Sequence, residues 1–143
     1  MLVVVYTRDG KYLLMRRVDH PEFWQSVTGS LTWEETDPRD TALRELAEET
    51  GISNPDGLRA LDLSNQYEIY PEWRHRYAPG ITHNIEHAFA LELPHPVAIT
   101  VNPEEHSEYR WVEFEQAIEL ATSYTNRDVI RLVQERTQGA AHE

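Results

Sequence analysis

The chain has no cysteine among its 143 residues, so it has no disulfide framework, no thiolate nucleophile and no thiolate metal site. Basic residues are also few: 13 Lys and Arg stand against 25 Asp and Glu, and the formal net charge is -12 at pH 7. Duplex nucleic acid and anionic membrane surfaces would repel such a chain, so we expect neither as a partner. A small phosphorylated ligand remains compatible with this charge if metal ions lie between the two.

Long hydrophobic runs are absent as well. The opening MLVVVY is too short for a membrane span or for the apolar core of a signal peptide. There is no Gly-rich loop ending in Gly-Lys-Ser/Thr, no nucleophile elbow and no His-Glu-x-x-His motif, so we interpret the His residues as surface or structural. We expect a cytoplasmic enzyme or binding domain without an obligate protein partner. With 40% hydrophobic content, residues 1–143 suffice for one domain.

Strand and helix signals follow one another in a mixed order. LVVVY and KYLLMRR flank an Arg-Asp-Gly turn signal, which predicts a β-hairpin, and FWQSVTGS predicts a third strand ending at Gly29. The later strand-like runs cover residues 58–70, 83–93 and 109–114, helical spacing covers 113–121 and 126–137, and a frayed tail is expected from 137. Together with the central helix described next, this order predicts an α/β (α+β) sandwich.

Local signals predict a helix over residues 38–50. Asp37 can cap its free backbone N–H groups, and Pro38 suits the first helical position. Gly51 suits a left-handed stop. The chain therefore enters and leaves this helix at well-marked points.

Three carboxylates lie close together in that helix, because Glu45, Glu48 and Glu49 are three and four residues apart. Like charges at these spacings repel each other by roughly 0.2–0.5 kcal/mol per pair. A helical wheel predicts that they lie on the solvent side, opposite an apolar side made of Ala42, Leu43, Leu46 and Ala47. Hard cations such as Mg²⁺ bind carboxylate, water and phosphate oxygens, and such an ion removes the repulsion. The acidic side thus indicates a site that holds metal against a polyphosphate.

Taken alone, the helix is also compatible with a solvated charged face in which Arg44 pairs with Asp40 and Glu48. The surrounding stretch, GSLTWEETDPRDTALRELAEETGI, favours the metal interpretation because it resembles the Nudix box, the signature of hydrolases that split nucleoside diphosphates linked to another group. The family pattern is Gly, five residues, Glu, seven residues, then Arg-Glu-U-x-Glu-Glu-x-Gly-U, where U is aliphatic. Its fixed types are present as Gly29, Glu35, Arg44, Glu45, Leu46, Glu48, Glu49, Gly51 and Ile52. Eight residues instead of seven separate Glu35 from Arg44, which leaves the placement of Glu35 open.

The resemblance implies a Nudix-type α/β/α sandwich with a mixed central sheet and catalysis that depends on Mg²⁺, with Mn²⁺ able to substitute. It implies that Glu45 and Glu49 are metal ligands, and that Glu48 binds metal directly, binds through water, or acts on the nucleophile. Arg44 would orient these carboxylates. Gly29 would allow a close backbone approach where strand meets loop.

Segments outside the box resemble one branch of this family, the dihydroneopterin triphosphate diphosphatases of bacterial folate synthesis. These segments are LMRR (14–17), PEFWQSVTGS (21–30), RHRYAPGITHN (74–84), LELPHP (91–96), EEHSEYRW (104–111) and TNR (125–127). The resemblance implies a third metal ligand at Glu105, which immediately precedes a His, and the adjacent Glu104 stays the alternative.

The branch acts on a small-molecule triphosphate, so the resemblance implies conversion of dihydroneopterin triphosphate to dihydroneopterin monophosphate and pyrophosphate. A general (deoxy)nucleoside triphosphate pyrophosphohydrolase acting on dATP is the alternative, since pterin and purine share a fused-ring shape and hydrogen-bonding edges. A nucleotide-sensing domain without catalysis is a more remote alternative, because such a domain would lack box residues, whereas this chain keeps Arg44 and the three helix carboxylates.

Substrate contacts are expected from several segments. Arg16 and Arg17 end the second strand, where alternation sends them to opposite faces, and the resemblance favours Arg16 on the phosphates. A guanidinium fork matches phosphate oxygens. Thr28 could donate a hydrogen bond to the substrate or be an ordinary strand residue. The remaining positions that match substrate contacts of the branch are Tyr67, Glu68, Ile69, Tyr70 and Ser123, and the loop residues Arg74, His75, Arg76 and Tyr77 are candidates for gating.

Overall fold

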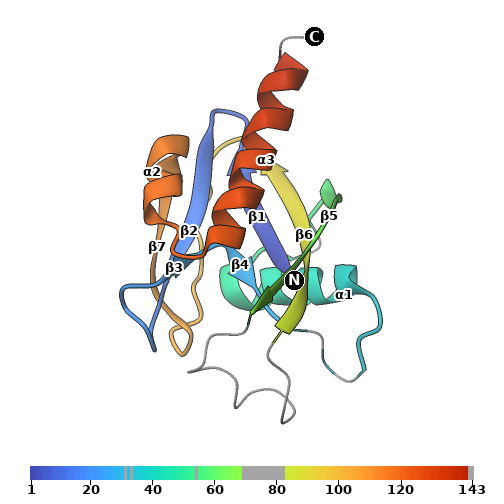
Figure 1. Ribbon diagram of the computed structural model, residues 1–143. Coiled ribbons are helices and arrows are strands. Elements are labelled where there is room, and N and C mark those ends of the chain that lie inside the picture. Colours follow the sequence, from blue (N-terminus) through green and yellow to red (C-terminus); the bar gives the residue numbers. More distant parts are fainter. Residues whose placement is uncertain (31, 33, 54, 69–82, 142–143) are drawn as a thin grey trace.

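A computed structural model describes residues 1–30, 32, 34–53, 55–68 and 83–141 of the chain (Figure 1). Its strands are β1 (Leu2–Thr7), β2 (Lys11–Arg17), β3 (Trp24–Gln25), β4 (Val27–Thr28), β5 (Leu58–Glu68), β6 (His83–Leu93) and β7 (His106–Glu113). Its helices are α1 (Pro38–Thr50), α2 (Phe114–Leu120) and α3 (Tyr124–Ala141). None of the described helices is long and apolar enough to cross a membrane.

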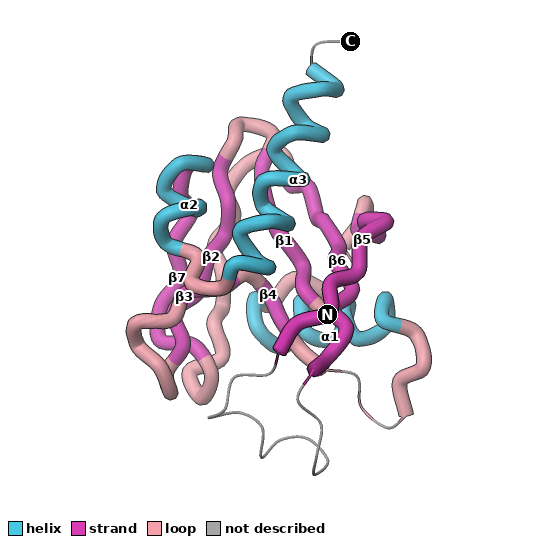
Figure 2. Tube along the Cα trace, in the orientation of Figure 1, coloured by secondary structure: helices cyan, strands magenta, loops and turns pink. Residues whose placement is uncertain are grey.

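The strands form one mixed sheet, as predicted. Its main order is β3-β2-β1-β6-β5, while β4 pairs with β1 and β7 pairs with β2. The central strand β1 is antiparallel to β2 and parallel to β6. Because parallel neighbours need a crossover, the chain between β1 and β6 has room for α1, which runs crosswise at the lower end of the strands (Figure 2).

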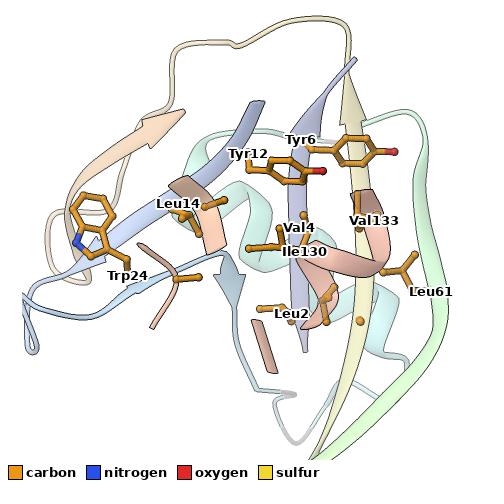
Figure 3. Close-up of a cluster of buried hydrophobic side chains, with 14 residues drawn as sticks. Leu2, Val4, Tyr6, Tyr12, Leu14, Trp24, Leu61, Ile130 and Val133 are labelled. Carbon is orange, nitrogen blue, oxygen red and sulfur yellow. The ribbon is translucent and has the colours of Figure 1, made fainter. Parts of the chain in front are cut away.

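Two apolar layers cover the two faces of the sheet, and β1 alternates between them. Leu2 and Val4 lie in one cluster with Ile130 of α3 (Figure 3). Val3 lies in the other with Leu46 of α1. Every residue of β1 is therefore buried, which explains why it reads as a continuous apolar run rather than an alternating one. Each buried aliphatic side chain stabilises the fold by about 1.5–3 kcal/mol, so α1 and α3 are firmly held on opposite faces.

The bounds of α1 agree with the prediction. The Asp37 side chain accepts a hydrogen bond from the Arg39 backbone N–H at 3.0 Å, and Pro38 begins the helix. Gly51 ends it with a φ of 81°, in the left-handed region that glycine adopts without strain. The N–H of Gly51 returns to the carbonyl of Ala47 at 3.1 Å.

Three other predicted elements differ from the structure. The strand predicted over FWQSVTGS is broken at Ser26, so that β3 pairs with β2 and β4 pairs with β1. Asn126 of α3 holds the break: its Oδ1 accepts from the Ser26 N–H at 2.8 Å, and its Nδ2 donates to the Ser26 Oγ at 2.9 Å. Strand β7 begins at His106, earlier than predicted, and Phe114 begins a helix instead of ending a strand. Helix α3 continues through residue 141, so the frayed tail predicted from residue 137 was wrong for 137–141.

Candidate active site

Of the three clustered glutamates of α1, two have buried side chains. Glu45 is 8% exposed and Glu49 only 1%, whereas Glu48 is exposed. The predicted solvent-side placement was therefore wrong for Glu45 and Glu49. Ala42, Glu45, Leu46 and Glu49 have the i, i+3, i+4, i+7 spacing of one helix face, and burying Leu46 on the sheet takes both carboxylates with it.

Gly29 makes room for one of these carboxylates. It directly follows β4, and a β-carbon built there would lie 2.4 Å from the Glu45 Cδ and 2.5 Å from its Oε1. A β-carbon at that distance fits only if the Glu45 side chain moves, so the close backbone approach that the box resemblance implied is present at this position. The carboxylate of Glu45 is packed against the end of the strand.

Arg44 ties the box together through its guanidinium. Its Nε donates to Glu35 at 2.9 Å and its Nη2 to the same carboxylate at 3.0 Å, while its Nη1 donates to Glu45 at 2.7 Å and to Glu48 at 3.2 Å. The hydrogen bond from Arg44, helped by the Thr32 N–H, lowers the pKa of Glu35 to about 2. The additional residue between Glu35 and Arg44 therefore leaves their contact intact, which resolves the placement of Glu35.

Glu45 and Glu49 form a buried pair of like groups. Burial is the main cause that raises the pKa of Glu45, and Arg44 opposes it. Burial likewise raises the pKa of Glu49 well above its ordinary value, with the charge of Glu45 next and that of Glu105 adding to it. The hydrogen bond with the Glu45 carboxyl group also raises the pKa of Glu49, whereas the one from the Thr28 backbone N–H lowers it. Negative charge gathered here is costly until a cation joins it.

A third carboxylate, that of Glu105, comes from a segment far from α1 in the sequence. Candidate ligand atoms of Glu49, Glu105 and His106 lie within 4.8 Å of one another, and Glu105 is exposed while the other two are buried. The neighbouring Glu104 is not part of this group. The backbone N–H of Val18 donates to the Glu105 carbonyl at 2.9 Å, which fixes the turn that precedes β7.

His106 is the residue that sequence reasoning missed, because we interpreted the His residues as surface or structural. It is 1% exposed, and its Nδ1 lies 3.7 Å from the Glu49 Oε1. Burial, followed by the charge of Arg17, lowers the pKa of His106 to about 4, so the ring is neutral at pH 7. The available signal was its position directly after Glu105 at the start of a strand.

Arg16, which was predicted to bind phosphate, is bonded to protein groups in the structure. The Nε of Arg16 donates to the Pro21 carbonyl at 2.6 Å, and its Nη1 donates to Glu108 at 3.1 Å. Arg17 forms a two-pronged ion pair with Asp19 at 2.7 and 2.8 Å.

The other predicted contact residues are scattered. Thr28 ends β4 beside Gly29, paired with Leu2. The Oγ of Ser123 is 2.8 Å from the Oγ1 of Thr125 just before α3. Tyr67 and Glu68 end β5, whereas Ile69, Tyr70 and the loop residues Arg74, His75, Arg76 and Tyr77 lie outside the described residues.

Carboxylates of the described residues thus converge from α1 and from the turn before β7, and Arg44 donates a hydrogen bond to one of them, Glu45. This donor set suits a hard divalent cation. The buried Glu49 Oε2 has no hydrogen-bond partner among the described residues, as expected where a cation completes the site, and the His106 Nδ1 has no partner among them either.

Known proteins resemble this chain over most of its length. Residues 1–133 match the NUDIX domain family. The chain is 43% identical over 134 residues to the dihydroneopterin triphosphate diphosphatase of Escherichia coli, covering 91% of this chain and 87% of that protein. It is 39% identical over 135 residues to the Haemophilus influenzae protein of the same name, covering 92% and 84%. The solved structure of the E. coli dihydroneopterin triphosphate pyrophosphohydrolase superposes with a TM-score of 0.82 at 40% identity, covering 92% of this chain and 90% of that one.

Proposed function

The chain belongs to the Nudix hydrolase family, and from that premise we propose that it is a Mg²⁺-dependent pyrophosphohydrolase that converts dihydroneopterin triphosphate and water to dihydroneopterin monophosphate and pyrophosphate, a step of folate synthesis. The observation that supports this choice of substrate is the 43% identity, over nine-tenths of the chain, to an enzyme named for this reaction. We also propose that residues 1–143 act as one domain.

The residues present fit a divalent cation. We propose that Glu45, Glu49 and Glu105 hold it. Candidate ligand atoms of Glu49 and Glu105 lie within 4.8 Å of each other, Glu45 interacts with Glu49, and the buried Oε2 of Glu49 has no hydrogen-bond partner among the described residues. Bound there, a divalent cation supplies positive charge that polarises a phosphoryl oxygen and lowers the pKa of water. Its charge would also offset that of Glu45, which after burial is the main cause that raises the pKa of Glu49.

The chain itself supplies positioning and proton transfer. Arg44 donates to Glu45 and Glu48 through one nitrogen, so it holds both carboxylates in a fixed relation. Glu48 has half of its side chain exposed, at 51%, and is the carboxylate of the helix best placed to accept a proton from the attacking water. Catalysis then rests mainly on positioning and on electrostatic stabilisation of the polyphosphate.

Contacts to the substrate are proposed for Arg16, Thr28 and Ser123, and for the segment of residues 67–70. Thr28 is supported by its place beside Gly29 and Glu49. Arg16 can bind phosphate only if its guanidinium exchanges Glu108 and the Pro21 carbonyl for the ligand. Because both of these bonds are partly exposed, the exchange is inexpensive.

The test compares kcat/KM for dihydroneopterin triphosphate, dATP and the other common nucleoside triphosphates, in Mg²⁺ with pyrophosphate detected. We expect a preference of at least tenfold for the pterin. Equal or better rates on dATP would support the general nucleotide alternative, and no turnover of any triphosphate would refute the enzyme assignment. The Glu49→Gln variant should lose activity, and Glu135→Gln, an exposed change on α3, is the matched control.

A further inference from the structure

His106 and Gln25 lie beside the proposed metal ligands without belonging to them. Both side chains are buried, at 1% and 5% exposure, although both are polar. They come from β7 and β3, which flank β2 in the sheet. Buried polar groups are costly unless they bond, so a pair kept here needs a reason.

The contact between them determines where the imidazole carries its proton. The Nε2 of Gln25 lies 3.0 Å from the Nε2 of His106. With its amide nitrogen facing the ring, Gln25 donates and the His106 Nε2 accepts, and a neutral ring in this arrangement carries its hydrogen on Nδ1. That Nδ1–H has no hydrogen-bond partner among the described residues and faces Glu49.

The distance to Glu49 leaves one short movement to complete the contact. The Nδ1 is 3.7 Å from the Glu49 Oε1, and the Oε2 of the same carboxylate also has no partner among the described atoms. A shift of about 0.7 Å would bring nitrogen and oxygen to a normal hydrogen-bond length. A protonated Nδ1 cannot bind a cation, but it can hold the carboxylate that does.

We propose that Gln25 and His106 are positioning residues, in which Gln25 sets the Nδ1–H tautomer of His106 and that N–H orients the carboxylate of Glu49 for metal binding. This inference rests on the proposed function, because it takes Glu49 as a ligand. Removing the groups that orient metal ligands typically weakens metal affinity 10–100-fold.

Mn²⁺ binding to the metal-free protein, measured by titration calorimetry without substrate, tests the proposal. His106→Leu should weaken Mn²⁺ binding at least tenfold. His106→Asn should stay within about threefold of the parent protein, because its amide nitrogen is the same number of bonds from the β-carbon as the histidine Nδ1. Equal weakening in both variants, or in neither, overturns the proposal.

A spectroscopic measurement addresses the tautomer directly. Two-bond ¹H–¹⁵N correlations of the imidazole, assigned by their loss in His106→Asn, should show the hydrogen on Nδ1 in the metal-free protein and after addition of Mg²⁺. A hydrogen on Nε2 overturns the proposal. If His106→Leu does not fold, Gln25→Met serves instead, and it should mix the tautomers and weaken Mn²⁺ binding; an unchanged tautomer and affinity also overturn the proposal.

Glu49→Gln separates the two levels of inference. If it leaves Mn²⁺ affinity unchanged, the metal site of the proposed function is wrong. If it weakens binding while His106→Leu does not, the metal site stands and only the positioning role fails.

Discussion

Replacing Gly29 with Ala should impair catalysis far more than folding. A β-carbon at this position would lie 2.4 Å from the Glu45 Cδ, and an ordinary contact of about 3.4 Å requires a displacement of about 1 Å. The carboxylate is the end of a flexible side chain, so it moves while the strand stays. Misplacing a catalytic group by 1 Å costs about 100-fold in rate, and we expect a loss of that order in kcat.

The expected effect on stability is smaller and can be bounded. Overpacking costs about 1–3 kcal/mol, whereas replacing Gly by Ala recovers about 0.4–1 kcal/mol from the unfolded chain at a backbone conformation that Ala can adopt. Gly29 is not among the glycines with positive φ, so this gain applies. The net loss in the free energy of unfolding should be about 0–2.5 kcal/mol.

The assay pairs kcat in Mg²⁺ with urea unfolding of the metal-free protein. Gly10→Ala is the control, because its φ of 90° strains Ala by about 1–2 kcal/mol while nothing lies within 4 Å of the added carbon. This control should lose stability and keep its activity. Wild-type kcat in Gly29→Ala, or a loss of activity in Gly10→Ala that equals it, would refute the reasoning.

Three further predictions concern the same cluster and its support. Glu105→Gln should weaken Mn²⁺ binding about tenfold or more while Glu104→Gln should not, and calorimetry that gives the reverse order would move the ligand to Glu104. Without metal, the raised pKa of Glu49 means that the folded state holds a proton that the unfolded state has lost, so the contribution of this group to the free energy of unfolding should fall as pH rises from the ordinary Glu value of 4.5 through the raised pKa. The lowered pKa of His106 acts with the opposite sign between about pH 4 and 6.5, so the contribution of Glu49 is taken as the difference from Glu49→Gln; urea titrations should show this contribution disappear with saturating Mg²⁺. Asn126→Ala leaves the buried Ser26 N–H and hydroxyl without partners, and it should cost about 1–3 kcal/mol in urea unfolding, with Asp128→Ala on the exposed side of α3 as a neutral comparison.

Local features of the chain could be read from the sequence because their causes lie within a few residues. The bounds of α1 depend on Asp37, Pro38 and Gly51, whose backbone preferences act in place. The hairpin of β1 and β2 follows from an Asp-Gly turn between two apolar runs. The family also follows from the sequence, because the residues from Arg44 to Ile52 keep the spacing of the box although one additional residue precedes Arg44.

Features that need contacts between distant segments were decided by the tertiary structure. Whether Glu45 and Glu49 face solvent depends on which side of α1 the sheet takes, and the choice that buries Leu46 also buries both carboxylates. The break at Ser26 depends on Asn126, a hundred residues later. His106 meets Gln25 only because β7 and β3 both pair with β2.

The sequence by itself thus determined the family, the acidic helix and its ends, since these depend on residue types at short spacings. Only the tertiary structure decided that Glu45 and Glu49 are buried as a repelling pair, that Glu105 rather than Glu104 lies near Glu49, and that a neutral histidine faces them. The physical reason is that burial and long-range contact set the cost of charge, and neither is visible in the order of the residues.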